Sequence, residues 1–397
     1  MGPLSHPSRA GLFIKQPQGY SAFIPKPLPP DPSVTIDDEM LSLLSQADRA
    51  LGRLDGSTEA LPNPDLFVFM YVRKEAVLSS QIEGTQASLI DVLEFEAQTL
   101  EPGHPQDVEG VVNYVRAMNY GLERLRTLPV SLRLIREIHE RLMHGVRGGQ
   151  WNPGEFRQSQ NWIGPPGCNL QSASFVPPPV NEMRQALDNL ERYLHGELPT
   201  PDLIKVGLAH AQFETIHPFL DGNGRVGRLL IAFLLCECGV LRRPLLYLSY
   251  YFKQNRQEYY DRLQAVRHKG DWEGWLKFFL RGVNSVAQEA SATARQIVNQ
   301  REAYRDLIGK RFGRSAANGL ALLESLYQRP VIRVQHVVEA TGITFANANN
   351  LVGQLVENGL LREVTGKKRN RIFTYQPYLD LFRDNLVETP DVAINET

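Results

Sequence analysis

Apolar residues recur at helical spacing along most of the chain, and this periodicity constrains the fold more than any other feature of the sequence. It predicts helices over 37–52, 64–80, 88–98, 107–126, 131–144, 181–195, 201–216, 223–238, 255–268 and 271–312. Residues 149–180 interrupt the pattern, because Gly, Pro and aromatic side chains dominate there, as is typical of a β-hairpin. We therefore expect a mostly α fold with a helical core and one extended flap.

The two ends of the chain differ from this helical centre. Residues 1–35 are rich in Pro and Gly, and we expect either disorder or an extended arm, whose residues 20–33 pack in cis or in trans. Residues 315–376 predict three short helices followed by a hairpin around the sequence GKKR, which is the outline of a winged helix-turn-helix. The last residues are partly acidic, and we expect a loosely held tail.

These patterns divide the chain into consecutive segments. We expect an N-terminal arm and helical extension over 1–100, a catalytic core over 101–290, a helical linker over 291–314, the winged helix-turn-helix over 315–376 and the tail over 377–397. The flap at 149–180 belongs to the core.

Composition and charge exclude several classes of protein. With 43 Lys and Arg against 44 Asp and Glu, the chain is not a globally basic nucleic-acid binder. Its longest apolar run, 229–236, is too short to cross a bilayer, so we expect no membrane partner. Its three cysteines form no disulfide framework, and we expect a cytoplasmic protein.

The stretch HPFLDGNGRVGR, residues 217–228, carries most of the chemical information. Gly222 and Gly224 on either side of Asn223 let successive backbone N–H groups converge on an anion, and the helix expected from 223 adds its positive N-terminal end. Arg225 and Arg228 are three residues apart, so we expect them on one face and within reach of the same phosphate.

An aspartate and a histidine complete this stretch. Asp221 has the wrong charge for a phosphate unless a cation lies between the two, and Mg²⁺ is the usual one. The ordinary pKa of His217 lies near neutrality, so it is a candidate general base. The stretch therefore predicts phosphate binding, a divalent cation and a proton acceptor.

These residues resemble the active-site motif of the Fic (filamentation induced by cAMP) family, HxFx[DE]GNGRxxR. Every defined position matches, namely His217, Phe219, Asp221, Gly222, Asn223, Gly224, Arg225 and Arg228. The helices from about 107 to 240 resemble the family's core, and residues 149–180 take the place of its target-binding flap.

The resemblance implies a protein adenylyltransferase, which transfers AMP from ATP to a Ser, Thr or Tyr hydroxyl of a target protein. His217 would deprotonate that hydroxyl, Asp221 would hold Mg²⁺ or Mn²⁺, and the glycines and arginines of the motif would bind the phosphates. Phe219 would be buried. A phosphotransferring branch of the family has Lys in place of Gly224, so the glycine favours nucleotidyl transfer.

The stretch SSQIEG, residues 79–84, resembles the family's inhibitory motif [ST]xxxE[GN], matched by Ser79, Glu83 and Gly84. The resemblance implies that Glu83 pairs with Arg228 and competes with the γ-phosphate of ATP. The alternative is an ordinary helix end. In some family members the same glutamate serves to remove AMP from the target, so this reverse activity is left open.

Residues from 248 onward resemble the segment that lines the family's adenine pocket. Asn255 would hydrogen-bond the base, and Tyr259 or Tyr260 would pack against it. The alternative places the tyrosines in the core and makes Asn255 the N-cap of the next helix.

In the flap, Trp162, Ile163 and Gly164 would present a strand edge to a target peptide, or the hairpin merely covers the site. Three histidines outside the motif have simpler interpretations. We expect His210 to be a packed side chain, and HERLMH at 139–144 lacks the histidine spacing of zinc proteases.

The resemblance also implies partners: ATP, an unknown target protein, a second copy in a homodimer, and the chain itself through self-modification. The rival function is a DNA-binding regulator whose Fic domain is a sensor. Its wing carries Arg362, Lys367, Lys368, Arg369 and Arg371 against Glu363, which suits DNA phosphates. The expected recognition helix, 344–358, has no Lys or Arg.

Overall fold

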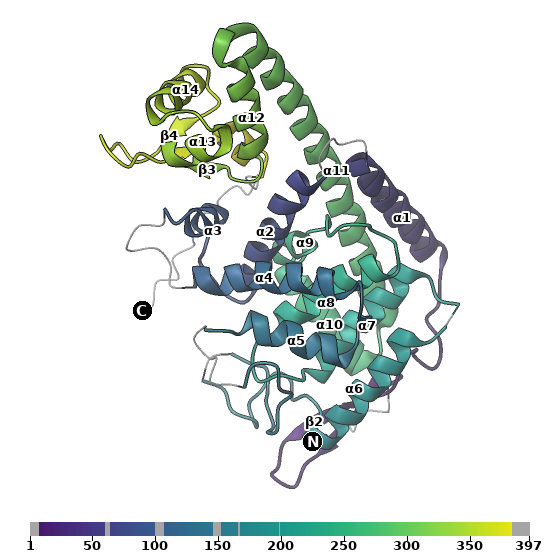
Figure 1. The fold of residues 1–397 in the computed structure, drawn as a ribbon. Helices are drawn as coiled ribbons and strands as arrows, with labels where there is room; N and C mark the ends of the chain where they lie inside the picture. Colours follow the sequence, from purple (N-terminus) through teal and green to yellow (C-terminus); the bar gives the residue numbers. More distant parts are fainter. Residues whose placement is uncertain are drawn as a thin grey trace, which may run out of the picture. The chain divides into compact units, whose positions relative to one another are not determined.

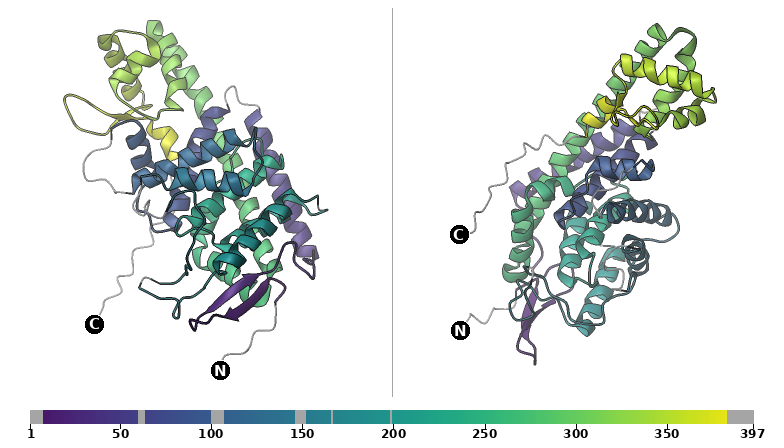
Figure 2. Two further views of the ribbon diagram at one scale, coloured as in Figure 1. Left: turned by 60° about the horizontal axis from the view of Figure 1, so that its bottom comes forward. Right: turned by 90° about the vertical axis from the view of Figure 1, so that its left-hand side faces the viewer.

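The computed structural model describes residues 8–59, 64–99, 107–145, 152–165, 167–197 and 199–382 (Figures 1 and 2). They form two compact units, Met1–Glu96 with Leu100–Ala292, and Ala97–Thr99 with Thr293–Thr397. The first residues of the expected flap, 149–151, and most of the expected tail, from 383 onward, lie outside the described residues.

The first unit is mostly helical, and every helix expected between 37 and 312 is present. Its helices are α1 (Asp38–Glu59), α2 (Asp65–Ile82), α3 (Leu89–Glu96), α4 (Val108–Arg124), α5 (Leu132–Leu142), α6 (Val180–His195), α7 (Asp202–Ile216), α8 (Asn223–Glu237), α9 (Ser249–Gln254), α10 (Arg256–Lys269) and the start of α11 (Trp272–Arg311). The periodicity did not predict the short helix α9. In the described residues, no helix combines the length and apolarity that a bilayer span requires.

Helices α7 and α8 form the centre of this unit. Every residue from 206 to 216 and from 226 to 235 is buried, so both helices are covered on all sides. They pack against each other, and α2, α4 and α5 contact α8 while α6 and α10 contact α7. The motif 217–228 includes the link between these two helices, and the surrounding core therefore fixes its position.

The N-terminal arm is a hairpin packed in cis rather than an extended strand. Its strands β1 (Gly11–Lys15) and β2 (Ser21–Pro25) pair antiparallel, with Leu12 opposite Ile24. The N–H of Phe23 donates to the carbonyl of Val176 at 2.9 Å, and the Phe23 side chain is buried. The arm thus lies against the second half of the flap; Figure 2 shows the hairpin in purple.

The flap pairs over a much shorter length than expected. Within its described residues, 152–165 and 167–180, Ile163 and Phe175 form an isolated bridge with two backbone hydrogen bonds of 2.8 and 3.0 Å. Pro165 and Pro177 lie two residues beyond the bridge on the two arms, and proline has no N–H to donate to a longer ladder.

The second unit contains the three helices and the hairpin expected near the C-terminus. The elements are α12 (Ala316–Leu326), β3 (Val331–Ile332), α13 (Val334–Thr341), α14 (Phe345–Glu357), β4 (Arg362–Glu363), β5 (Phe373–Thr374) and α15 (Gln376–Asp380), preceded by the 3₁₀ turn η1 (Gly313–Ser315). The strands form an antiparallel sheet in the order β3-β5-β4. The designation winged helix-turn-helix stays a prediction.

Candidate active site

His217 lies where α7 ends, in a left-handed backbone conformation with φ 50° and ψ 61°. This conformation is uncommon for a residue other than glycine. Its carbonyl accepts hydrogen bonds from Nε of Arg157 at 3.0 Å and from Nδ2 of Asn161 at 3.3 Å. The two donors fix the unusual turn and, with it, the direction of the His217 side chain.

Both donors lie at the base of the flap, and neither was predicted from the sequence. The Arg157 side chain also donates to the carbonyls of Ser159 and Pro178, and burial lowers its pKa to about 10. Asn161 donates as well to the carbonyl of Phe219 at 2.9 Å. The flap base is therefore locked to the motif. A signal was available, since a lone arginine amid Gly, Pro and aromatic residues is unusual.

The environment of the His217 imidazole favours its neutral form. Burial first, and then the positive charges of Arg267 and Arg157, lower its pKa below the ordinary histidine value. Its Nδ1 is buried and has no hydrogen-bond partner among the described residues. A neutral imidazole can accept a proton.

His139 of α5 positions the middle of the motif. Its Nδ1 accepts the N–H of Gly154 at 2.9 Å, so the proton lies on Nε2, which donates to the carbonyl of Asp221 at 3.1 Å. Its ring stacks on Phe219 with centroids 3.7 Å apart, and Phe219 is fully buried, as expected. Burial lowers the pKa of His139 to about 4, which keeps this tautomer neutral.

The loop 219–223 is closed by its own side chains. Asn223 is buried, and its amide pairs with both the N–H and the carbonyl of Phe219 at 2.8 Å. Gly222 has φ 78°, and a Cβ there would lie 3.0 Å from Sδ of Met143. The side chain of Asn223 is thus committed to the loop. Because the first N–H groups of a helix have no partner within it, the start of α8 offers backbone donors to an anion.

Asp221 can serve as a cation ligand, although one carboxylate is not a complete site. Its Oδ1 accepts the N–H of Gly222 at 2.6 Å, and its side chain is 52% exposed. The described residues contain no group of three or more His, Cys, Asp or Glu that could hold a metal. Mg²⁺ commonly uses one or two carboxylates plus substrate phosphates, so Asp221 fits a metal that arrives with a nucleotide.

The two arginines of the motif lie against different neighbours. Arg225 points toward Sδ of Met143 at 3.4 Å and the carboxylate of Asp221 at 3.7 Å. Arg228 is buried and points to α2, where its Nε donates to Oγ of Ser79 at 2.8 Å and a terminal nitrogen donates to the Ser79 carbonyl at 2.9 Å.

The same nitrogen of Arg228 also donates to Oε1 of Glu83 at 2.6 Å, so the structure brings these two residues together. Glu83 follows the last residue of α2, and Gly84 after it has φ 97°. A Cβ at Gly224 would lie 2.2 Å from the Glu83 oxygen. The carboxylate therefore occupies the space directly above the N-terminus of α8.

A second glutamate, Glu75, anchors the middle of α2. Its carboxylate accepts the N–H of Ser249 at 3.1 Å, the Ser249 hydroxyl, and the hydroxyl of Tyr114 at 3.2 Å. Complete burial raises its pKa to about 7, although these donors act in the opposite direction. One indirect sign of this role is visible in the sequence, because the glutamate lies within the largely apolar stretch VFMYVRKEAVL.

The three residues expected at an adenine pocket differ in their burial and in their hydrogen bonds. Tyr259 is 1% exposed, and its hydroxyl lies 2.9 Å from Nε2 of the packed His210, so it belongs to the core. Tyr260 is 37% exposed, and burial and the nearby Glu83 raise its pKa. Asn255 lies between α9 and α10, and its side-chain amide donates to the carbonyl of Tyr251 at 3.0 Å.

The residues expected to bind a target lie at the paired part of the flap. Trp162 is 41% exposed, and its indole N–H donates to the carbonyl of Cys168 at 3.2 Å. Ile163 forms the bridge to Phe175. A Cβ at Gly164 would lie 2.5 Å from Sγ of Cys168, so the glycine allows the two arms to meet.

Comparison with known families matches the two segments that form this site. Residues 41–123 match the model described as Fic/DOC family N-terminal, and residues 129–235 match that of the Fic/DOC family. The chain therefore contains the two segments that the Fic/DOC family models describe. The Fic/DOC N-terminal segment contains Glu83, and the Fic/DOC domain contains the whole of 217–228.

Relatives and solved structures agree with this assignment. A probable protein adenylyltransferase of Aquifex aeolicus is 32% identical over 207 residues, which are 50% of this chain and 56% of the relative. Protein adenylyltransferase Fic of Drosophila yakuba is 27% identical over 257 residues, 62% of this chain and 46% of the relative. The chain therefore spans about half the length of these relatives.

The fold is similar to that of a solved Fic family protein from Desulfovibrio desulfuricans G20. The two have a TM-score of 0.57 and 20% identity, and the match covers 86% of this chain and 97% of the other. This likeness concerns the Fic fold.

Proposed function

We propose that the chain is a protein adenylyltransferase that transfers AMP from ATP to a Ser, Thr or Tyr hydroxyl of a target protein, and that Glu83 inhibits it. One observation carries the proposal: Glu83 contacts Arg228 at 2.6 Å directly above the glycine-rich start of α8. A carboxylate that occupies an anion site keeps a phosphate from binding there, and this would inhibit the enzyme. We call this pair the inhibitory contact.

The proposed reaction is a substitution at the α-phosphorus of ATP. The imidazole of His217 takes the proton of the target hydroxyl, and the hydroxyl oxygen forms a bond to the α-phosphorus. The bond from this phosphorus to the bridging oxygen breaks, and pyrophosphate leaves with the electron pair. A divalent cation, held by Asp221 and the phosphates, would neutralise charge on the leaving group.

The residues of the chain would act mainly by positioning the reacting groups and by stabilising the negative charge of the phosphates. The N–H groups at the start of α8 and the guanidinium of Arg225 would stabilise the phosphate oxygens. Arg228 would bind the γ-phosphate after Glu83 leaves it. His139, Arg157 and Asn161 would act as positioning residues, because each holds a backbone carbonyl of the motif loop.

Intact-mass measurement after incubation with ATP and Mg²⁺ tests this proposal. Three proteins are compared: wild type, Glu83→Gly, and Glu83→Gly combined with His217→Ala. We expect AMP addition on Glu83→Gly, much less on wild type and none on the double variant. If self-modification is absent, cell lysate with ATP labelled at the α-phosphate supplies other hydroxyls. No transfer in either assay by Glu83→Gly, while it binds ATP, contradicts the proposal.

DNA binding is not proposed as a second function. Helix α14 carries no Lys or Arg between Phe345 and Glu357. In the wing, the guanidinium of Arg371 donates to Oδ1 of Asn349 at 2.6 Å, which commits one basic group and one amide to each other.

A further inference from the structure

Arg267 of α10 is a buried arginine that has no ion-pair partner among the described residues. Its guanidinium donates to three neutral oxygens, namely the Glu214 carbonyl at 3.1 Å, Oγ1 of Thr215 at 3.3 Å and Oε1 of Gln264 at 3.1 Å. Burial lowers its pKa to about 10, so it keeps its positive charge at neutral pH. A buried cation without a counter-ion is costly to stability, and such exceptions are typical of functional sites.

This arginine connects the helix that carries His217 with the flap. Two of its hydrogen bonds reach the last turn of α7, two and three residues before His217. Its guanidinium carbon lies 3.9 Å from the centre of the Phe175 ring, which belongs to the bridge between the two arms of the flap. Gln264, which accepts from Arg267, in turn donates to the Ser174 carbonyl at 3.3 Å. One side chain therefore holds the end of α7 and the paired part of the flap together.

The charge of Arg267 also acts on the imidazole of His217. After burial, the positive charges of Arg267 and then of Arg157 lower the pKa of His217, while the Glu214 carbonyl acts in the opposite direction. The Glu214 carboxyl is itself buried, and burial raises its pKa to about 7. The neutral form of His217, which can accept a proton, is thus favoured by a cation that contacts both α7 and the flap.

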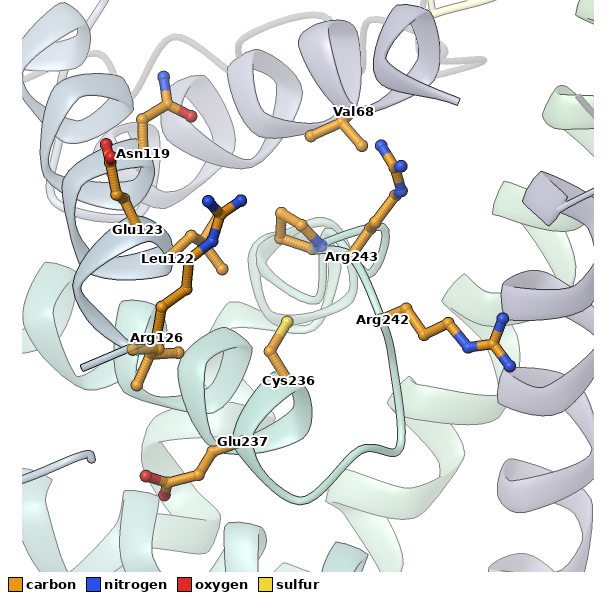
Figure 3. Close-up of a pocket in the computed structure, with 11 residues that line it drawn as sticks. Val68, Asn119, Leu122, Glu123, Arg126, Cys236, Glu237, Arg242 and Arg243 are labelled. Carbon is orange, nitrogen blue, oxygen red and sulfur yellow. The ribbon is translucent and has the colours of Figure 1, made fainter. Parts of the chain in front are cut away.

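A cavity of about 820 Å³ beside the end of α8 has a balanced arrangement of charge instead (Figure 3). No described residue of α7, α10 or the flap lines it. Its lining combines three arginines with two carboxylates: Arg126, Arg242, Arg243, Glu123 and Glu237. Arg242 there has Asp55 as a partner at 3.6 Å. The cavity therefore favours neither sign of charge, whereas Arg267 contributes a positive charge with which no described carboxylate pairs.

We propose that Arg267 is a positioning residue, which holds His217 and the flap bridge in one register so that the hydroxyl of a bound target meets the base. The role in AMP transfer rests on the proposed function, whereas the coupling of Arg267 to His217 and to the flap does not. A lysine cannot take its place, because an ammonium group lacks the planar fork of donors that reaches Glu214, Thr215 and Gln264 at once.

Proton NMR of the histidine imidazoles tests the coupling without catalysis. The His217 signal is assigned with His217→Ala and followed from pH 8 down to the lowest pH at which circular dichroism shows an intact fold. Loss of a positive charge raises the pKa of a nearby imidazole, so His217 should be protonated to a greater extent at low pH in Arg267→Gln than in wild type.

The control for this titration is Arg262→Gln, which removes an arginine of α10 that pairs with Glu258. Glu214 is present in every protein compared, so its own titration does not distinguish them. If His217 titrates in Arg267→Gln as it does in the control, the coupling is contradicted.

AMP transfer in the Glu83→Gly background tests the role in the reaction. We expect Arg267→Gln and Arg267→Lys to lower kcat about tenfold or more, because the base and the hydroxyl are no longer aligned. The KM for ATP should change less than about twofold, since the hydrogen bonds of Arg267 go to α7 and α10 and not to the phosphate-binding residues. A kcat equal to that of Arg262→Gln contradicts the positioning role. If Glu83→Gly itself transfers no AMP while the NMR result stands, the proposed function fails and the coupling remains.

A milder pair of variants applies if Arg267→Gln does not fold. Gln264→Ala removes the link from Arg267 to the flap at a partly exposed position. The matched control is Gln257→Ala, because Gln257 donates within α10. Hydrogen exchange in peptides from the flap bridge should be about threefold faster in Gln264→Ala than in the control, since a hydrogen bond that restrains the bridge is lost. Equal exchange in the two variants contradicts the proposal.

Discussion

The middle of α2 and its C-terminal end each present a glutamate, and the two have opposite environments. Glu75 is fully buried and accepts hydrogen bonds from two neighbouring helical segments through Ser249 and Tyr114. Glu83 is 39% exposed and contacts one buried arginine. The difference indicates that Glu75 holds the helix in the fold, while Glu83 makes a contact that a competing anion can displace without unfolding the helix.

Removal of the exposed carboxylate has the largest expected effect. Glu83→Gly should raise the affinity for ATP about 10- to 100-fold, because Arg228 becomes available to the γ-phosphate. The free energy of unfolding should fall by about 1 kcal/mol, because the buried Arg228 loses a partner that is partly exposed and that water can replace. Calorimetry and urea denaturation measure the two quantities. A large loss of stability would mean that Glu83 anchors the helix as Glu75 does.

The buried carboxylate should make stability depend on pH. The pKa of Glu75 is raised to about 7 in the folded state from 4.5, so its stabilising contribution is complete below pH 4.5 and is lost as the pH rises through 7. The loss amounts to at most about 3 kcal/mol. Glu75→Gln should remove this pH-dependent part of the free energy of unfolding, because an amide does not titrate. The Ser249 and Tyr114 hydroxyls can still accept hydrogen bonds from the amide. Urea denaturation at pH 5 and pH 8 compares the two proteins, and parallel pH profiles would exclude this role.

Truncation of the buried carboxylate should cost stability at any pH. At pH 5, Glu75→Ala should lower the free energy of unfolding by about 1–3 kcal/mol, since Ser249 and Tyr114 lose a buried partner. The double variant with Ser249→Ala should lose less than the sum of the two single variants, because both remove the same hydrogen bonds. Strict additivity would contradict the proposed anchor.

The smallest effect is expected at Ser79, between the two glutamates. Ser79→Ala removes the acceptor of Arg228 Nε, and we expect a loss of about 1 kcal/mol in the free energy of unfolding. The affinity for ATP should change less than about threefold, because Glu83 still holds Arg228. A change as large as that of Glu83→Gly would assign the inhibition to Ser79 instead.

The helices and the motif could be predicted from the sequence because their signals are local. Apolar periodicity located every helix of the central region except the six-residue α9, which is too short to show a period. Gly222, Asn223 and Gly224 are adjacent in sequence, and in combination with Arg225 and Arg228 they predict an anion site at a helix start. The N-terminal hairpin was missed because Pro-rich sequence favours extended backbone without specifying its pairing.

The residues that hold the site in place could not be predicted, because their partners are far apart in sequence. His139 binds the Asp221 carbonyl across 82 positions, and Glu75 binds Ser249 across 174. No local pattern encodes such contacts. A weak sign existed in each case, an ionisable residue on an otherwise apolar helix face. The burial of Tyr259 likewise depends on His210, whose ring nitrogen accepts or donates the hydrogen bond that the tyrosine needs.

Gly224 links the chemistry of the family to its regulation through one missing side chain. The Glu83 oxygen lies within 2.2 Å of the position that a Cβ at 224 would take. Any side chain at this position would force the Glu83 carboxylate to move. The absence of a side chain at 224 therefore leaves the room in which Glu83 reaches Arg228.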